Sequence, residues 1–435
     1  MTKATLPYSP TAYDYLEIDL PQVWTVRHLV DAPVIADVVA STRPCVSEIA
    51  ADPRVRPGAE VAIGVGSRGI ANLQMVVLTV IMELQALGCK PFVVPAMGSH
   101  GGATAAGQRQ LLAEYGITEA ELGVEIRATM EVEQVGALED GYPVYFDKNA
   151  YAADAVVLIN RIKHHTDFSG DIESGICKMA AIGLGKQYGA ERIHRYGADG
   201  LRNIIPQVGR KLVQSTNIIG GIALIENGRG ETAEIHAVTP EGIGGQQERD
   251  LLKRSKELAP KLAFDEVDVL VLDEMGKNIS GAGMDTHVIG RVEMPSIDGS
   301  TWPGPNVRVV TVLSLTPESH GNASGLGLAD IITLQMFGSI NWDYTVTNQR
   351  TSCEGGVRRG RIPVVLESSE GAVRSSIGGC GRGDYSSVKI VRIRNTAFTT
   401  VMQITEPLLA EARSRADIEI ISGPEPMDLN KLVGA

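Results

Sequence analysis

Histidine and lysine side chains are concentrated in one segment of the chain, which ends at His194. His164 and His165 follow the apolar run AVVLIN, and Lys178 and Lys186 stand among apolar neighbours in the sequence ESGICKMAAIGLGK. A lysine is costly to bury unless it has a partner, so lysines in such surroundings indicate chemistry or anion binding. If these side chains converge on one cleft, they suit a metal ion or a covalently held cofactor.

The preceding chain has the rhythm of an α/β fold, which would position further side chains. Residues 60–69 are a predicted strand ending beside Arg68, and residues 90–104 are a second one that runs into a glycine turn at His100. Residues 71–88 between them predict a helix that is apolar nearly all round and therefore well buried. Because ligands bind at the carboxyl ends of strands in parallel α/β sheets, we expect Arg68 and His100 to serve one site.

The histidine pair itself follows a third predicted strand, residues 154–165. Adjacent residues on a strand point to opposite faces, so only one of His164 and His165 can face a given cleft. Thr104 is the predicted N-cap of the helix after the second strand, and Gly88 is the predicted C-cap of the helix before it.

A change in composition near Leu262 predicts a domain boundary, giving an N-terminal α/β domain over residues 1–262 and a C-terminal α/β domain over 263–435. The fold class is therefore α/β, and we expect a cofactor and substrate cleft between the two domains. The second domain opens with a buried strand at 267, followed by a glycine loop that carries Lys277. The other elements predicted are an edge strand at 13–20, a helix at 204–215, a hairpin from 217–227 and 233–240, an exposed charged helix at 244–262, a helix near 325–338 and a terminal helix at 404–417 that is able to pack back on the first domain.

Composition restricts the class of protein. Among 435 residues, 43% are hydrophobic and 21% are charged, as in ordinary globular proteins. The net charge of −12 argues against nucleic acid or an anionic membrane as a partner. The five cysteines form no CxxC pair, which speaks against disulfides, zinc knuckles and iron–sulfur clusters. We find no signal peptide and no apolar run of about 18 residues, and expect a cytoplasmic protein.

Common catalytic motifs are absent. The sequence has no GxGxxG with dinucleotide-binding spacing, no GxxxxGK[ST] phosphate loop, no GxSxG elbow and no HExxH. The chemistry must therefore come from the less usual set of arginine, histidines and lysines described above.

That set resembles the family of lactate racemases that use a nickel-pincer nucleotide. The resemblance is carried by Arg68, by SHGGAT (99–104), by KHHTDFSGDIESGICKM (163–179) and by His194, and DEMGKNISGAGMDTHVIGR extends it into the second domain. It departs at Val65, where the family has an acidic residue, and at Glu173, in a stretch longer than the family's. The resemblance therefore does not imply that lactate is the substrate.

The resemblance implies an isomerase that inverts C2 of a 2-hydroxy acid by hydride transfer to and from the nickel-pincer nucleotide, through a 2-keto acid. The nucleotide is a pyridinium-3-thioamide-5-thiocarboxylic acid mononucleotide carrying nickel, and cofactor biosynthesis proteins would load it. The implied roles are His100 and His165 as acid/base residues, Arg68 and Lys277 as substrate-binding cations, Lys178 as the cofactor tether, Ser99, Gly101 and Gly102 as further cofactor contacts, and His194 as the nickel ligand.

Such a set of residues suits the chemistry. The C2–H bond of a hydroxy acid is hardly acidic, so its removal as hydride to an electron sink avoids a free carbanion. The pKa of histidine lies near neutral pH, where it can both accept and donate the hydroxyl proton. Each enantiomer places its hydroxyl on a different side, so one base is needed for each. Two alternatives stay open: a non-catalytic protein that binds the same cofactor, and a nickel-free α/β enzyme that binds an anion.

Overall fold

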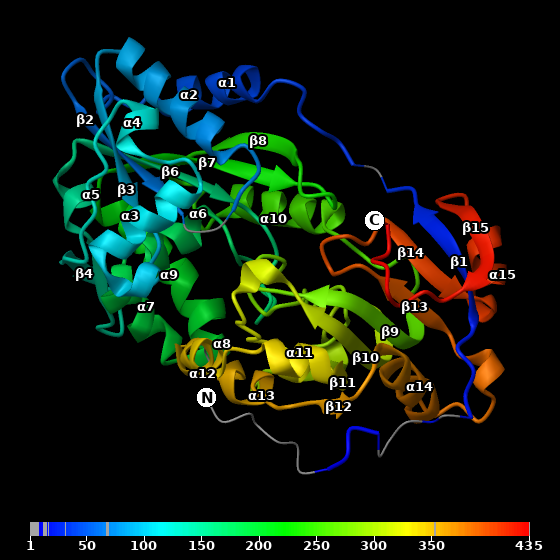
Figure 1. The fold of residues 1–435 in the computed structure, drawn as a ribbon. Coiled ribbons are helices and arrows are strands. Elements are labelled where there is room, and N and C mark those ends of the chain that lie inside the picture. The colour runs from blue at the N-terminus through cyan, green and yellow to red at the C-terminus, as the bar shows by residue number, and fades with distance from the viewer. Residues whose placement is uncertain are drawn as a thin grey trace. The chain divides into compact units, whose positions relative to one another are not determined.

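The structure is a computed structural model. It describes residues 8–11, 15, 17–30, 32–66, 69–351 and 354–434. The chain divides into two compact units (Figure 1). The N-terminal unit comprises residues 32–259, and the C-terminal unit combines the first strand of the chain with everything from Pro260 onward. Both units are mixed α/β, which confirms the predicted fold class.

The N-terminal unit is built on a five-stranded sheet with strand order β3-β2-β6-β7-β8. The first four strands in this order are parallel to their neighbours, and β8 is antiparallel to β7. The strands are β2 (Glu60–Val65), β3 (Lys90–Pro95), β6 (Ala155–Arg161), β7 (Ile218–Glu226) and β8 (Thr232–Val238). The β7–β8 pair is the predicted hairpin.

Short apolar runs explain these strands. β2 (EVAIGV) and the start of β6 (AVVLI) are almost fully buried, as expected of parallel strands covered on both faces. Alternate residues of β2, Val61, Ile63 and Val65, join a core with helices α1 (Val38–Ile49) and α2 (Leu73–Ala86) (Figure 1).

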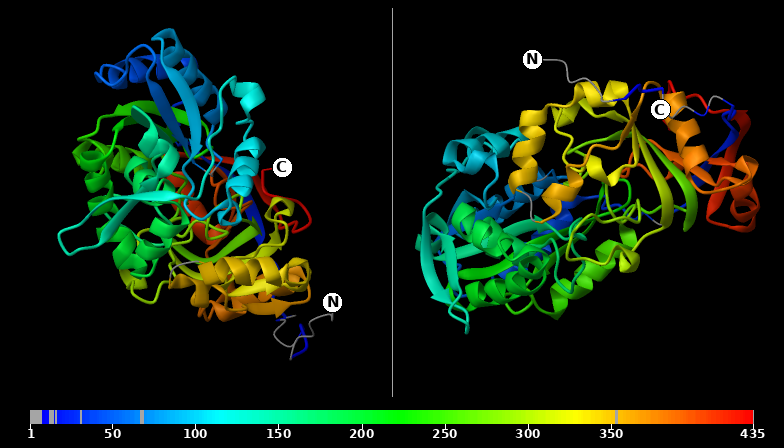
Figure 2. Two further views of the ribbon diagram at one scale, coloured as in Figure 1. Left: turned by 90° about the vertical axis from the view of Figure 1, so that its left-hand side faces the viewer. Right: turned by 90° about the horizontal axis from the view of Figure 1, so that it is seen from below.

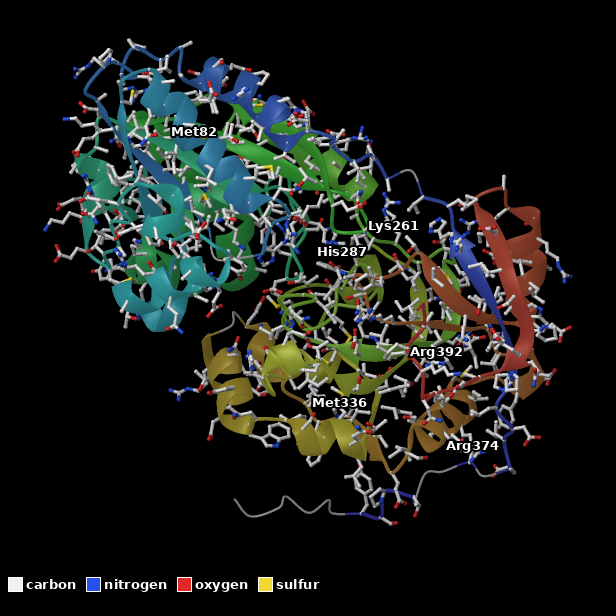
Figure 3. The ribbon with its side chains drawn as sticks, turned by 45° about the horizontal axis from the view of Figure 1, so that its top comes forward. Met82, Lys261, His287, Met336, Arg374 and Arg392 are labelled. Atoms are coloured by element: carbon white, nitrogen blue, oxygen red, sulfur yellow. The ribbon has the colours of Figure 1, made fainter. Side chains whose placement is uncertain are left out.

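Helix α2 is less buried than predicted. Met82, labelled in Figure 3, is 60% exposed, and Met75 is 44% exposed. The sequence LQMVVLTVIMELQA is apolar on every side, but only the side with Val76, Val77 and Val80 packs on the sheet. Thr104 caps the next helix by accepting from the Gly107 amide at 3.0 Å, which confirms the predicted N-cap. The C-cap of α2 is Leu87, one residue before the predicted Gly88, which follows it with a φ of +81°.

The remaining elements of this unit surround the sheet, and an antiparallel pair, β4 and β5, extends from it as a hairpin (Figure 2). They are α3 (Ala105–Glu114), α4 (Glu119–Leu122), β4 (Val132–Ala137), β5 (Pro143–Asp147), α5 (Lys148–Ala152), α6 (Ile176–Lys178), α7 (Lys186–His194), α8 (Gly197–Asp199), α9 (Ile205–Ser215) and α10 (Gln246–Leu258), with a 3₁₀ turn η1 (Gly101–Ala103) and π segments η2 (Met179–Gly183) and η3 (Gly200–Ile204).

Helix α10 corrects one prediction. It was expected to be an exposed charged helix, yet Glu248, Leu251, Leu252 and Ser255 are buried. Among the many charged residues of this helix, apolar residues recur at helical spacing and form a buried stripe. Glu248 is buried because its carboxylate accepts a hydrogen bond from the backbone amide of Cys177.

The C-terminal unit contains an eight-stranded sheet with the order β12-β11-β10-β9-β13-β14-β1-β15. Its strands are β1 (Gln22–His28), β9 (Glu266–Met275), β10 (Asn306–Leu315), β11 (Ile331–Thr333), β12 (Val364–Leu366), β13 (Ile390–Ile393), β14 (Val401–Thr405) and β15 (Ile418–Pro426). Its helices are α11 (Leu334–Ser339), α12 (Trp342–Thr351), α13 (Gly355–Arg359), α14 (Ser369–Gly379) and α15 (Leu409–Ser414), with short 3₁₀ turns η4 (Gly299–Thr301), η5 (Pro317–Ser319), η6 (Leu326–Leu328), η7 (Tyr385–Ser387) and η8 (Glu406–Leu408).

A buried ionic cluster supports this second sheet. Arg392 on β13, labelled in Figure 3, is 1% exposed and donates to the Asp273 carboxylate at 2.7 Å and to the Gln403 amide oxygen at 3.0 Å. Burial raises the pKa of Asp273, and the guanidinium opposes that shift. The ion pair between Arg392 and Asp273 compensates both charges, and burying either of them unpaired would strongly destabilise the fold.

Several predicted boundaries differ from the structure. The predicted first domain began at residue 1, but β1 pairs with β14 and β15, so it belongs to the C-terminal sheet. The predicted edge strand at 13–20 lies partly outside the described residues, and its described part is not strand. The predicted helix near 325–338 is interrupted by β11, which is rich in β-branched residues. The predicted terminal helix is reduced to α15, which is followed by β15.

Across the described part of the chain, no helix is both long and apolar enough to cross a lipid bilayer.

Candidate active site

The strand order of the N-terminal unit gives it a topological switch point. From β2 the chain proceeds to β3 on one side, whereas β6 pairs with β2 on the other. In open parallel sheets, ligands bind at the carboxyl ends of the strands where the order reverses. The loops after β2, β3 and β6 all leave from this edge, and they carry the predicted Arg68, His100 and His165. Arg68 and the neighbouring Ser67 lie outside the described residues.

The loop after β3 presents His100. This residue is exposed and extended, and it precedes η1. Gly101 and Gly102 have φ of +66° and +64°, in the left-handed region. A Cβ on Gly101 would lie 2.6 Å from the backbone of Gly107 and Gln108, so this position requires glycine, whereas Gly102 has open space around it. Ser99 is half-buried and its carbonyl accepts from the Ala103 amide at 3.1 Å.

A buried lysine holds this loop. The Lys186 ammonium is 0% exposed and lies 3.0 Å from the Asp147 carboxylate, 3.1 Å from the Gln108 amide oxygen and 2.5 Å from the Pro95 carbonyl at the end of β3. The Gln108 side chain in turn donates to the His100 carbonyl at 3.3 Å and to the Gly98 carbonyl at 2.9 Å. Lys186 is therefore a structural anchor of the loop.

Lys186 was singled out from the sequence, but its two side-chain partners, Asp147 and Gln108, were not predicted. Asp147 ends β5 and also caps α5, where its carboxylate accepts from the Ala150 amide at 2.9 Å. An aspartate at the junction of an apolar strand and a helix is usually explained by the cap alone. Gln108 is fully buried inside α3, a position that only the fold reveals.

His164 and His165 lie in the loop after β6, which ends at Arg161, and not on the strand as predicted, and their environments differ. His164 is 4% exposed, and His165 is half-buried with its ring 4.7 Å from that of Phe168. The Asp167 amide donates to Nδ1 of His165 at 3.1 Å. In this arrangement a neutral His165 carries its proton on Nε2. Its other nitrogen, Nδ1, can accept a proton only after the hydrogen bond from the Asp167 amide is released.

Glu173 organises this loop from within. Its carboxylate is 1% exposed and accepts from the His165 amide at 2.5 Å, from the Gly170 amide at 3.1 Å and from the Lys256 ammonium of α10 at 2.6 Å. The residue that departs from the family pattern is thus the one that fixes the extended loop. Its charge is compensated by a cation from a helix that is distant in sequence.

Lys178 lies where this loop becomes helical. It is the half-buried last residue of α6, and the Cys177 amide before it donates to the buried Glu248 carboxylate at 3.0 Å. The π segment η2 follows at once, and π geometry is frequent at functional sites. The Gly98 amide donates to the Gly183 carbonyl at 3.0 Å, so this segment is joined to the His100 loop.

His194, the last residue of α7, lies within electrostatic range of Lys178. Burial and, to a smaller extent, the nearby Lys178 ammonium lower the pKa of His194 to about 4, although Asp167 and Glu191 oppose the shift. The ring is therefore neutral at pH 7 and offers a lone pair, which is the form that binds a metal ion. The imidazole and the amine thus have the chemistry required of a nickel ligand and a cofactor tether.

Lys277 belongs to the C-terminal unit. It follows β9, its ammonium donates to the Gly281 carbonyl at 2.6 Å, and its amide donates to the Ser319 hydroxyl at 2.9 Å. Its role as a second substrate-binding cation stays a prediction.

The fold and the three loops define an open α/β protein whose ligand site is expected at the switch point of the N-terminal sheet. Within that class, residues 50–187 match the family model of the lactate racemase N-terminal domain. This stretch of the chain is accordingly similar to the N-terminal domain of lactate racemases. The matched region includes His100, His165 and Lys178 and ends before His194.

Comparison of structures gave weaker similarities. The lactate racemase apoprotein from Thermoanaerobacterium thermosaccharolyticum has 11% identity and a TM-score of 0.43, with 93% of this chain and 98% of that chain covered. A structural-genomics protein from Thermotoga maritima has 13% identity and a TM-score of 0.44, with 63% of this chain and 70% of that chain covered. No curated protein sequence matches the chain.

Proposed function

We propose that this protein is a racemase or epimerase that inverts C2 of a 2-hydroxy acid with a nickel-pincer nucleotide as its cofactor. The observation that carries the proposal is the match over residues 50–187, because it includes His100, His165 and Lys178 together. The proximity of a neutral His194 to Lys178 supports it independently.

Lys178 and His194 are the residues that would hold the cofactor, the first as a covalent tether and the second as a nickel ligand. When bound, such a nucleotide accepts and returns the hydride that leaves C2. The donor set fits, because an imidazole that stays neutral at pH 7 is an available ligand for nickel. Gly102, where a Cβ would meet no neighbour, leaves the backbone of the loop after β3 open to a bulky nucleotide, and Ser99 and Gly101 would contact it from the same loop.

His100 and His165 would exchange the hydroxyl proton of the substrate, one for each enantiomer. His165 can do so only if the bond from the Asp167 amide to Nδ1 is released, so we expect the loop after β6 to shift when substrate binds. Arg68, by its place after β2, would grip the substrate carboxylate through paired hydrogen bonds and hold it while the carbonyl face is exchanged.

The first experiment is intact mass and nickel content of protein made in a host that also makes the cofactor. We expect a mononucleotide-sized adduct on Lys178, about one nickel per chain, and loss of the adduct in Lys178→Ala. An unmodified, nickel-free chain, in a host shown to load a known lactate racemase, would contradict the proposal.

The second step is a racemisation assay across 2-hydroxy acids with the loaded protein. His100→Ala and His165→Ala should each reduce inversion by at least about 100-fold, the usual contribution of a general acid or base. His236→Ala is the matched control, because this half-buried strand histidine pairs with Glu234 and lies on β8. Full inversion by either of the first two variants would refute the two-base assignment.

A further inference from the structure

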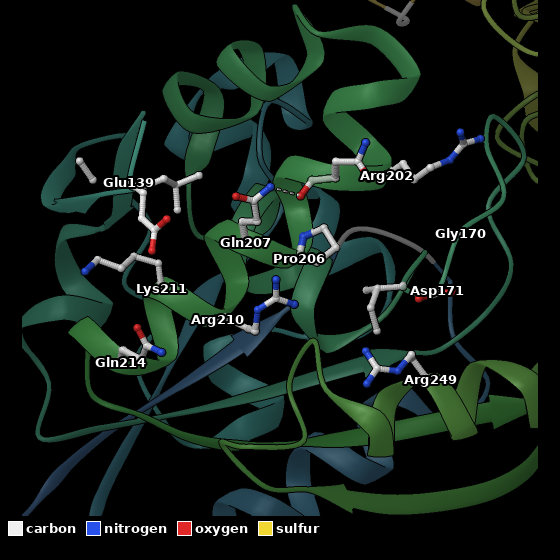
Figure 4. Close-up of a pocket in the computed structure, with 14 residues that line it drawn as sticks. Glu139, Gly170, Asp171, Arg202, Pro206, Gln207, Arg210, Lys211, Gln214 and Arg249 are labelled. Atoms are coloured by element: carbon white, nitrogen blue, oxygen red, sulfur yellow. Dashed lines mark hydrogen bonds between the residues drawn. The ribbon is translucent and has the colours of Figure 1, made fainter. Parts of the chain in front are cut away.

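A cavity lies in the N-terminal unit, and the residues proposed for catalysis do not line it. It has a volume of about 840 Å³ and lies between helices α9 and α10, the β4–β5 turn and the loop around Gly170 (Figure 4). Ligand pockets commonly have volumes of about 300–1,000 Å³. Among the described residues predicted for catalysis or cofactor binding, none lines it.

The wall of this cavity is cationic. Arg202, Arg210, Lys211 and Arg249 line it, against two carboxylates, Glu139 and Asp171. The lining thus has two more positive than negative side chains, in a chain whose net charge is −12. Such a local reversal of charge attracts anions even when the whole protein is acidic.

Helix α9 presents its share of the lining on one side. Gln207, Arg210, Lys211 and Gln214 recur at helical spacing and project into the cavity, as Figure 4 shows. The opposite side of the same helix buries Ile205, Val208 and Leu212 in the core. Packing of these apolar residues in the core fixes the orientation of α9, so its polar face is directed at the cavity.

The four cations lack carboxylate partners in the described structure. Arg210 donates to the Gly244 carbonyl at 3.3 Å, Arg249 to the Gln246 amide oxygen at 3.2 Å and Arg202 to the Ser169 carbonyl at 3.0 Å. Other arginines of the unit have carboxylate partners, for example Arg127 with Glu60 at 2.9 Å and Arg254 with Glu234 at 2.7 Å. Four cations around a cavity with only two carboxylates leave an excess of positive charge, which an anion bound between them would neutralise.

We propose that this cavity binds a small, multiply charged anion bearing phosphate or carboxylate groups. Guanidinium groups bind both kinds of oxyanion, often through two parallel hydrogen bonds. The side-chain amides of Asn203, Gln207 and Gln214 supply neutral donors and acceptors, and Glu139 and Asp171 are acceptors for hydroxyl groups of the ligand.

The cavity is joined to the loop that carries His165. Gly170, Asp171 and Ile172 line it, and they lie between His165 and Lys178 in the sequence. An anion that engages Arg202 would act on the same loop, because this side chain binds the Ser169 carbonyl. The ligand is therefore placed to influence the order of the loop after β6.

The test is isothermal titration of the full-length protein with inorganic pyrophosphate and, separately, with citrate. Saturable binding of at least one probe below about 10 mM, weakened by added salt, is expected. Binding of pyrophosphate alone identifies a phosphate site, and binding of citrate alone identifies a carboxylate site. Binding of neither probe would overturn the proposal, whether or not the protein carries a nickel cofactor.

Variants locate the binding. Arg210→Gln/Lys211→Gln should weaken it about tenfold, since each exposed charge pair contributes modestly. Arg43→Gln/Lys90→Gln removes the same charge from exposed positions outside the cavity and should change affinity little. The single variant Lys211→Glu keeps the Arg210 contact with Gly244 and should also abolish most of the anion binding. It therefore tests the site even if the double variant fails to fold. Equal weakening by the control pair would overturn the site.

Discussion

Replacing Lys186 by methionine distinguishes a structural anchor from a participant in the chemistry. The Lys186 ammonium is fully buried, 3.0 Å from the Asp147 carboxylate and 3.1 Å from the Gln108 amide oxygen. Methionine keeps an unbranched apolar stem and removes the charge. The Asp147 carboxylate, also 0% exposed, is then left without its cation.

Removing one member of a buried ion pair costs about 3–5 kcal/mol, because the remaining charge is poorly solvated. We expect Lys186→Met to lower the stability of the N-terminal unit by this amount at neutral pH. Burial already raises the pKa of Asp147, and loss of the ammonium raises it further. A carboxyl group whose pKa is higher folded than unfolded is stabilised by protonation, so the cost should shrink as the pH falls towards about 4.

The assay uses the distribution of tryptophan. All three tryptophans, Trp24, Trp302 and Trp342, belong to the C-terminal unit, so their fluorescence follows that unit alone. Far-ultraviolet circular dichroism follows both units. In urea, Lys186→Met should shift the dichroism transition and leave the fluorescence transition in place. Hydrogen exchange should also quicken at the His100 amide, which donates to the Met97 carbonyl at 3.1 Å.

Lys253→Met is the matched control, because Lys253 is an exposed lysine on α10. In the double variant Lys186→Met/Asp147→Asn, the asparagine still caps α5 but carries no charge, so its cost should be smaller than the sum of the single costs. If Lys186→Met unfolds at the same urea concentration as the control, the anchor role is refuted. Loss of activity in such a stable variant would instead assign Lys186 to the chemistry.

Two further predictions concern the same unit. Gly101→Ala should destabilise it by more than about 1 kcal/mol, because the new Cβ would lie 2.6 Å from backbone in a left-handed conformation, whereas Gly102→Ala meets no neighbour and should cost less in the same thermal melts. The pKa of His194 is lowered to about 4 in the folded protein, so at a pH between this value and the ordinary histidine pKa the side chain takes up a proton when the protein unfolds. The apoprotein should therefore lose about 2 kcal/mol of stability between about pH 7 and pH 5. His194→Gln should lose less in urea titrations at the two pH values, and an equal loss would contradict the assignment.

Local patterns in the sequence predicted the strands and loops of the N-terminal unit well. Strands β2, β3 and β6 are short apolar runs, so their existence and approximate starts could be predicted, but each ends several residues before the end of its predicted segment. The division of the chain could not. β1 pairs with β14, which lies almost 400 residues later, and no local pattern records a pairing of that kind.

The supporting contacts of the site were also beyond the sequence. Glu173 could be seen as a departure from the family, but its partner Lys256 stands on a helix whose pattern predicts only solvent exposure. Glu248 on the same helix is buried because the Cys177 and Gly244 amides bind its carboxylate. In each case a charged residue is explained by a backbone or side-chain contact that exists only once the fold has formed.

The place of β1 has a consequence for synthesis on the ribosome. This strand is translated before the N-terminal unit, whereas its two neighbours, β14 and β15, are translated after that unit. The N-terminal unit is complete in sequence by residue 259 and is free to fold while the remainder is still being made. The larger sheet cannot be completed until β14 and β15 have been made, so β1 stays an unpaired strand, open to pairing with other chains, throughout the synthesis of the N-terminal unit.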